Sequence, residues 1–265
     1  MQLQMVGLME GHKLKYLIMF ILLSSLGFAQ IQQQHLSVIA RKNVAVGGGG
    51  ALSIVYTDSI NCTGDCAAIT FTHWGSIQAD DLILLMLNCE DGTPIYSQSS
   101  DVSESGYTFM YGGGLNGLLG IGGFSKVASG SESGTFTVTN QTTTETIGFY
   151  VVVRNANTTD PVDSIATVTT SAAATSIAVV GVQTANNNSL VICHGGYDGG
   201  DFTNLAYSSG WTLYSSFSED LGNSFSNGGM WGYKYQVTAG ATGDCTISND
   251  VSDEWSGVVF SINPE

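Results

Sequence analysis

Residues 134–140 read Gly-Thr-Phe-Thr-Val-Thr-Asn, and residues 243–249 read Gly-Asp-Cys-Thr-Ile-Ser-Asn. In the first segment Phe136 and Val138 alternate with threonines, which is the period-two pattern of a strand that is buried on one face. The second segment begins and ends with the same residue types and lies 109 residues further along the chain. The two segments therefore predict equivalent β-strands within an internal repeat.

The repeat extends from these strands in both directions. Each half contains short runs rich in Val, Ile, Thr, Phe and Tyr, separated by Gly, Asn, Asp and Ser, which are typical turn residues. Such spacing favours a sandwich or a barrel. We predict an all-β fold of two tandem, internally duplicated antiparallel β-sandwich units of jelly-roll or immunoglobulin-like type, and two separate sandwiches or one larger sandwich both remain open. The corresponding segments are 82–87 and 190–193, 106–108 and 210–212, and 149–153 and 258–262.

The N-terminal segment has the order of a secretory signal peptide. The basic residues Lys13 and Lys15 precede an apolar run, Leu-Ile-Met-Phe-Ile-Leu-Leu at 17–23, and small residues stand at Gly27 and Ala29. We predict a signal peptide over residues 1–29, cleaved between Ala29 and Gln30, and a secreted, extracellular mature protein. An uncleaved anchor helix is the alternative, although the apolar run is shorter than the ~20 residues that span a bilayer.

The remaining chain divides into three predicted parts. Residues 30–50 form a lead-in rich in Gln and Gly, residues 51–160 form the first repeat, and residues 161–265 form the second. No other segment is apolar enough to enter a membrane, so no membrane contact is expected after cleavage.

The chain of 265 residues carries 22 acidic and 7 basic side chains, for a net charge of −15. This acidic balance excludes a nucleic-acid binder, which needs a basic surface. The apolar content of 43% excludes an acidic disordered tail.

The positions of the cysteines are partly consistent with an exported protein. Cys62 and Cys66 are separated by a turn, and an oxidising compartment favours a local disulfide between them. Cys193 and Cys245 stand in strand-like runs, where a bridge and two buried thiols are both open alternatives.

The chain also carries a family resemblance over about residues 69–265, and its second half matches better. The segments Asp80-Asp-Leu-Ile-Leu-Leu, Gly210-Trp-Thr212 and Ala239-Gly-Ala-Thr-Gly243, followed by a closing strand that ends in Ile-Asn-Pro at 262–264, resemble a β-rich module of secreted bacterial proteins and of phage tail or virion-associated proteins. The first half departs from it, because Tyr107 replaces the usual Trp and a Gly-rich insert follows. The resemblance implies a non-catalytic module for attachment or decoration, with no catalytic residues to assign.

The residues themselves support no strong catalytic motif. Gly130-Ser-Glu-Ser-Gly134 has Glu at the centre, where a hydrolase nucleophile elbow has Ser. Several adjacent acidic residues keep a glycan-active hydrolase as the weakest alternative, because glycosidases use two facing carboxylates.

Calcium is the one ion that the sequence favours. Asp198-Gly-Gly-Asp201 places two carboxylates on a turn whose carbonyl groups could also face a hard cation, and Glu90 with Asp91 is a weaker equivalent in the first half. An ordinary hairpin turn is the alternative.

Aromatic residues gather in the loops of the second half. We expect Tyr197 and Tyr207 to present exposed rings to a ligand, while Trp211 is a further candidate that the repeat also favours as a core residue. Together these features predict a secreted, non-catalytic protein that binds or decorates a surface, with a surface glycan or a protein as partner. The alternative is a structural, homo-oligomeric subunit of an extracellular assembly or phage-type particle.

Overall fold

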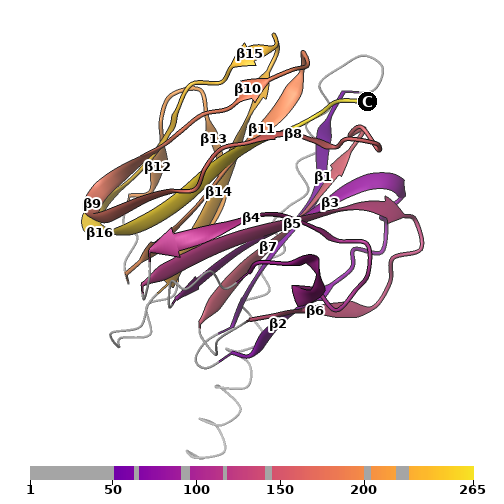
Figure 1. Ribbon diagram of the computed structural model, residues 1–265, viewed down its shortest axis with the longest axis horizontal. Helices are drawn as coiled ribbons and strands as arrows, with labels where there is room; N and C mark the ends of the chain where they lie inside the picture. Colours follow the sequence, from indigo (N-terminus) through magenta and orange to yellow (C-terminus); the bar gives the residue numbers. More distant parts are fainter. Residues whose placement is uncertain are drawn as a thin grey trace, which may run out of the picture. The chain divides into compact units, whose positions relative to one another are not determined.

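Two antiparallel β-sheets make up most of the described part of the protein (Figure 1). The computed structural model describes residues 51–62, 66–90, 96–115, 118–140, 145–199, 204–218 and 227–265. The predicted all-β class is confirmed, since the described residues hold strands and one short 3-10 turn, η1 (Ser99–Asp101), but no α-helix. The predicted signal peptide and the lead-in at 30–50 lie outside the described residues.

The first sheet is built from the first half of the chain. Its strand order is β1-β7-β3-β5-β4. A two-stranded sheet accompanies it, in which β2 (Ala68–Thr72) pairs with β6 (Thr135–Thr139). The bounds of the five main strands are β1 (Ser53–Cys62), β3 (Ala79–Glu90), β4 (Thr108–Leu115), β5 (Leu119–Ser129) and β7 (Thr146–Arg154).

The second sheet is built from the second half. Its main strand order is β12-β16-β11-β14-β13, and β8 and β9 also pair with the long strand β16. A separate two-stranded sheet joins β10 (Gln183–Thr184) to β15 (Gly240–Ala241). The remaining bounds are β8 (Val162–Ile165), β9 (Thr169–Val179), β11 (Ser189–Asp198), β12 (Ala206–Tyr207), β13 (Thr212–Ser218), β14 (Asn227–Gln236) and β16 (Cys245–Ile262).

The two sheets share the register of their central strands. Ile83 of β3 lies opposite Lys126 of β5, and Val191 of β11 lies opposite Lys234 of β14. The edge strands agree as well. The pairing of β4 with β5 shifts register after Phe109, and the pairing of β13 with β14 shifts register after Leu213. This agreement supports the predicted duplication, which itself stays a prediction.

Apolar residues pack in three clusters. The inner cluster joins the facing sides of the two sheets, with Leu84 and Phe149 from the first and Ile192 and Phe260 from the second. On its outer side the first sheet packs against β2 and β6, and the second packs against β9 and the first part of β16. Each half therefore has a core of its own, and a third core holds the halves together. The central strand β3 is buried on both faces, as its continuous run of apolar residues predicts.

A hydrogen-bonded polar network lies inside the inner cluster. The amide of Asn88 donates to Gly195 O at 3.1 Å, so its Oδ1 faces His194 Nε2 at 2.7 Å. His194 Nε2 must then carry the proton, and its Nδ1 accepts from the Tyr111 hydroxyl at 2.9 Å. Burial of the ring lowers the pKa of His194 to about 3, so the histidine is neutral in the native protein.

Glycines let the two sheets approach at this network. A Cβ added at Gly196 would stand 2.0 Å from Asn88 Nδ2, and one at Gly229 would stand 2.8 Å from Asn88 Oδ1. The backbone of the second sheet thus passes directly over the Asn88 side chain, and larger residues there would push the sheets apart.

Two disulfides connect described cysteines. Cys62 and Cys66 are bonded, as their spacing predicts. Cys193 and Cys245 are also bonded, so of the two alternatives left open by the sequence the structure has the bridge. Cys89 keeps its thiol, which donates to Gly120 O at 3.3 Å. Among the described residues, no helix has the length and apolar character needed to cross a bilayer.

Candidate functional site

A polar cavity of about 400 Å³ opens on the outer side of the first half. It is formed where the turn between β5 and β6 meets the segment that precedes β4. We call it the hydroxyl pocket, because its lining includes the hydroxyl groups of Ser103, Ser129, Ser131, Ser133 and Thr135. Its other lining residues are Glu104, Lys126, Glu132 and Phe136.

The β5–β6 turn is held in shape by Glu132. Gly130 and Gly134 flank it with φ angles of 82° and 77°, a backbone region in which glycine is favoured. The Glu132 carboxylate accepts hydrogen bonds from Ser129 N at 2.8 Å and Gly130 N at 2.9 Å, and from Ser129 Oγ at 3.0 Å. Burial by itself would raise the pKa of Glu132, but these bonds and Lys126 lower it to about 2, so the group is ionised.

Lys126 links the two carboxylates of the pocket. Its ammonium group donates to Glu104 and lies 3.2 Å from Glu132 Oε1. Burial acts to lower the pKa of Lys126, yet the two carboxylates together raise it. The ammonium group also lies 5.6 Å from the centre of the Tyr107 ring, within the range of a cation–π contact.

Polar side chains continue from Glu104 behind the pocket. His73 Nε2 lies 2.5 Å from Glu104 Oε2, and His73 Nδ1 lies 3.1 Å from the Tyr150 hydroxyl. The Glu104 side chain is 25% exposed, whereas that of Glu132 is 1% exposed, so Glu104 is the carboxylate more open to a ligand. A bound ligand would therefore meet hydroxyl groups, an accessible carboxylate and an ammonium group within one cavity.

The aromatic residues predicted to bind a ligand lie elsewhere, in the second half. The expectation of an exposed Tyr197 ring is wrong, because Tyr197 is fully buried. It lies on the central strand β11, where its ring packs on Trp255 with a centroid distance of 5.4 Å. A Cβ added at Gly228 of the neighbouring strand would stand 1.7 Å from that ring. Any residue larger than glycine at position 228 would therefore clash with Tyr197.

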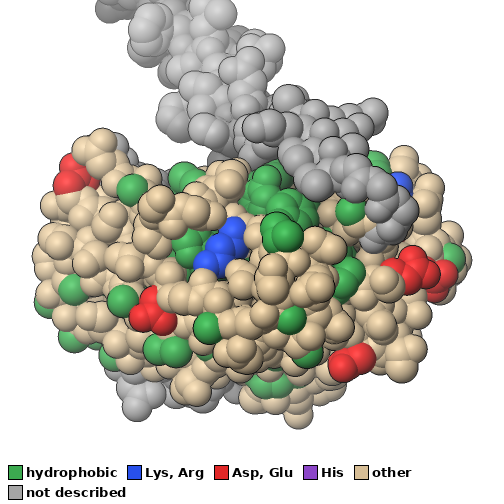
Figure 2. Space-filling model, turned by 90° about the horizontal axis from the view of Figure 1, so that it is seen from above, with side chains coloured by type: hydrophobic (Ala, Val, Ile, Leu, Met, Phe, Trp, Pro, Cys, Tyr) green, Lys and Arg blue, Asp and Glu red, His purple; other side chains and the backbone are tan. Residues whose placement is uncertain are grey.

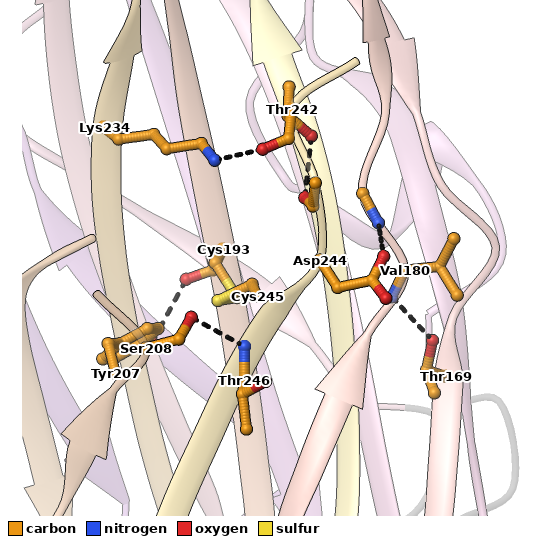
Figure 3. Close-up of a disulfide and its surroundings, with 12 residues drawn as sticks. Thr169, Val180, Cys193, Tyr207, Ser208, Lys234, Thr242, Asp244, Cys245 and Thr246 are labelled. Carbon is orange, nitrogen blue, oxygen red and sulfur yellow. Dashed lines mark hydrogen bonds between the residues drawn. A yellow bond between two sulfur atoms is a disulfide. The ribbon is translucent and has the colours of Figure 1, made fainter. Parts of the chain in front are cut away.

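Tyr207 and Trp211 are half-buried, and both pack against the same apolar cluster of the second half (Figure 3 shows Tyr207 and its surroundings). The Tyr207 hydroxyl donates to Cys193 O at 3.3 Å, and burial raises its pKa. The Trp211 ring faces the ammonium group of Lys234 at 4.4 Å. Both rings pack partly against the core of the second half, so ligand contact by them stays a prediction.

The predicted calcium turns are described only in part. Asp198 and Glu90 end their strands, while Asp201 and Asp91 lie outside the described residues. Asp198 lies opposite Glu254, and burial together with these two charges raises the pKa of the adjacent Asp253 to about 7. Within the described part of the chain, no three His, Cys, Asp or Glu residues form a group that could hold a metal ion. A calcium site that includes the other residues stays a prediction.

The hydroxyl pocket is not predicted by the sequence. Its charged residues come from separate segments, namely Glu104 before β4, Lys126 in β5 and Glu132 in the turn that follows. One short motif, Gly130-Ser-Glu-Ser-Gly134, does mark part of the pocket in the sequence. Its central residue, Glu132, excluded a nucleophile elbow, and the same residue orders the β5–β6 turn in the structure.

Comparison with known proteins gives no relative. No protein-family model matches the chain, and neither a curated protein nor a solved structure matches it.

Proposed function

We propose that this chain is a secreted, non-catalytic protein that binds or decorates a surface, and that it binds carbohydrate in the hydroxyl pocket. The observation that carries the proposal is the joint lining of one cavity by five hydroxyl-bearing residues, two carboxylates and one ammonium group. The cavity volume of about 400 Å³ lies within the range of small-ligand sites.

The chemistry of the pocket suits a ligand rich in hydroxyl groups. The carboxylate of Glu104 can accept hydrogen bonds from sugar hydroxyl groups, Lys126 can donate to them, and serine hydroxyls can do either. Phe136 supplies an apolar wall, although its ring is largely buried. Figure 2 shows one face of the molecule on which acidic and basic side chains are few and scattered, without a concentrated charge of one sign.

The charge state of Glu132 argues against its use as the proton-donating acid of a glycoside hydrolase. A glycosidase needs one carboxylic acid that keeps its proton and donates it to the leaving group. The pKa of Glu132 is lowered to about 2, and Lys126 lies against both carboxylates. A protonated Glu132 is therefore rare near neutral pH, which supports the binding proposal over the hydrolase alternative.

Substitution in the pocket tests the proposal. We expect the protein to retain saccharides on a glycan array, and Glu104→Gln to weaken that binding about tenfold to hundredfold, the usual effect of losing a charged hydrogen-bond partner. Calorimetry with the best saccharide on the array would measure the change. Asp160→Asn is the matched control, since it removes one exposed carboxylate that does not line the pocket.

Two results would contradict the pocket as the binding site. One is equal affinity of Glu104→Gln and the parent protein, and the other is retention of no saccharide by the folded parent protein. Far-UV circular dichroism and the melting temperature of each variant would confirm that it is folded.

A second function, as a subunit of an extracellular assembly, is favoured by the edge of the second sheet. Strand β9 pairs with β16 along one side, and the described residues supply no strand for its other side. Beside it lies a cavity of about 560 Å³ whose lining includes Ile165 and Val180, which are 36% and 54% exposed. An unpaired edge next to exposed apolar side chains is a typical surface for pairing with another copy.

Light scattering at increasing protein concentration tests this second function. We expect the mass to rise above that of one chain, and Val180→Lys to hold the protein at the monomer mass, since it places a charge in the contact. Val237→Lys is the control, because Val237 is 69% exposed but does not line that cavity. A monomer mass for the parent protein at every concentration would exclude self-assembly through β9.

A further inference from the structure

Lys126 and Lys234 occupy equivalent places in the two sheets. Lys126 lies opposite Ile83 in the first sheet, and Lys234 lies opposite Val191 in the second. Each ammonium group also faces an aromatic ring, that of Tyr107 at 5.6 Å and that of Trp211 at 4.4 Å. The two lysines therefore occupy the same position in their respective sheets, and the residues around them can be compared directly.

The surroundings differ in their acidic residues. Lys126 has two carboxylate partners, Glu104 and Glu132. Lys234 donates to the backbone oxygen of Thr242 and, within the described residues, has no carboxylate within 4.0 Å. Ser208 takes the position of Glu104, because it also lies four residues before the equivalent strand residue, Thr212.

The Asp244 carboxylate, which Figure 3 draws in the surroundings of Lys234, is directed elsewhere. Asp244 accepts from Gly181 N at 3.1 Å, and in Figure 3 its side chain points away from Lys234 towards the neighbouring strands. The Ser208 hydroxyl accepts from Thr246 N at 3.1 Å and carries no charge. Lys234 is thus a half-buried cation whose described surroundings leave its charge unbalanced.

An unbalanced, half-buried ammonium group favours an anion. Burial lowers the pKa of Lys234, which means that its charged form is less well stabilised than in water. An ammonium group has three N–H donors, and Thr242 O accepts from one of them, which leaves donors for an oxyanion. The net negative charge of the whole protein acts weakly here, since salt screens charges beyond about 10 Å.

We infer that Lys234, beside the half-buried ring of Trp211, forms a second binding site that takes the carboxylate or sulfate group of an acidic saccharide. This inference rests on the proposed carbohydrate binding and adds a specificity to it. The hydroxyl pocket, with its internal ion pairs, takes neutral hydroxyl groups, while the Lys234 site takes the negative group that Glu104 and Glu132 would repel. The Trp211 ring, a predicted ligand contact, then lies against the charged group instead of forming a stacking surface of its own.

The test compares an oligoglucuronate with a neutral oligoglucose of equal length and linkage. We expect the parent protein to bind the acidic oligomer at least about tenfold more tightly at low salt, and Lys234→Gln to remove that preference. Lys234→Arg is the matched variant that keeps the charge and should keep most of the preference. Lys126→Gln should weaken binding of the neutral oligomer and leave the preference for the acidic one.

Inorganic sulfate tests the Lys234 anion site independently of saccharide binding. Sulfate added to the labelled protein should shift the indole N–H resonance of Trp211, assigned with Trp211→Phe, in the parent protein but not in Lys234→Gln. If both oligomers bind equally and sulfate shifts nothing, the inference is wrong and the proposed function stands. If sulfate shifts Trp211 while neither oligomer binds, the anion site is correct, but the saccharide ligand and the proposed function are both wrong.

Discussion

Lowering the pH from about 6 to about 4 is expected to destabilise the native protein by about 3 kcal/mol relative to a His194→Gln variant, because each pH unit is worth ~1.4 kcal/mol for one uncompensated proton. His194 is fully buried between the two sheets, and burial lowers its pKa to about 3. In the unfolded chain the same ring has a pKa near ~6.5 and takes up a proton below that value. Stability therefore falls as the pH drops from about 6.5 towards 3, since only the unfolded state is protonated there.

Comparison with the variant is needed because other groups titrate in the same range. The pKa of Asp253 is raised to about 7, so its contribution runs in the opposite direction and favours the native state as the pH falls. This contribution is present in both proteins and cancels in the difference. Of the side chains bonded to the His194 ring, the Tyr111 hydroxyl is titratable and Asn88 is not.

Urea unfolding at a series of pH values measures the effect. His194→Gln is expected to be less stable at pH 7 because the network with Asn88 is altered, but the pH dependence of the difference is the result that matters. His73→Gln is a matched control, because His73 is also buried but its Nε2 faces Glu104. A constant free-energy difference between parent and His194→Gln from pH 6 to 4 would contradict a neutral, buried His194.

Removing the disulfide between Cys193 and Cys245 is expected to cost about 4 kcal/mol of stability, the value that loop-closure entropy gives for this separation. The two cysteines are 52 residues apart and are fully buried. The bond joins β11 in the second sheet to the first part of β16, which covers the outer face of that sheet. Without the disulfide, the unfolded chain gains conformational entropy, and no additional native contact offsets that gain.

The second disulfide of the chain supplies the control. Cys62 and Cys66 are 4 residues apart, so their loss is expected to cost only about 2 kcal/mol. Urea unfolding of Cys193→Ala/Cys245→Ala and Cys62→Ala/Cys66→Ala would measure both. An equal or larger loss for the local pair would show that the long-range bridge does not restrict the unfolded chain as proposed. A strong dependence on the long-range bridge would also agree with the proposed export, since disulfides persist in oxidising compartments.

Strand content and strand correspondence could be predicted from the residues alone. Alternation of Phe136 and Val138 with threonine marks a half-buried strand, and the apolar run at 82–87 marks a strand buried on both faces. Turn residues between such runs depend only on local backbone preferences. The same is true of Cys62 and Cys66, whose short separation keeps them close in any compact fold.

The candidate site could not be predicted in this way. Tyr197 was expected to be exposed, but it lies on a strand with partners on both sides and packs on Trp255. A loop-like neighbourhood in the sequence does not reveal which face of a strand is later covered by another layer.

Local patterns of residues determined the strands, their turns and the match between the halves, because a period of two and a turn preference act over a few neighbours. Tertiary packing alone brought Glu104, Lys126 and Glu132 around one cavity and placed His194 against Asn88, 106 residues away. Among the described residues, it also left Lys234 without the carboxylates that its counterpart has. These contacts depend on which strands pair and which faces of the sheets meet. They join segments that are far apart in the chain, and neither segment's local sequence indicates the other as its partner.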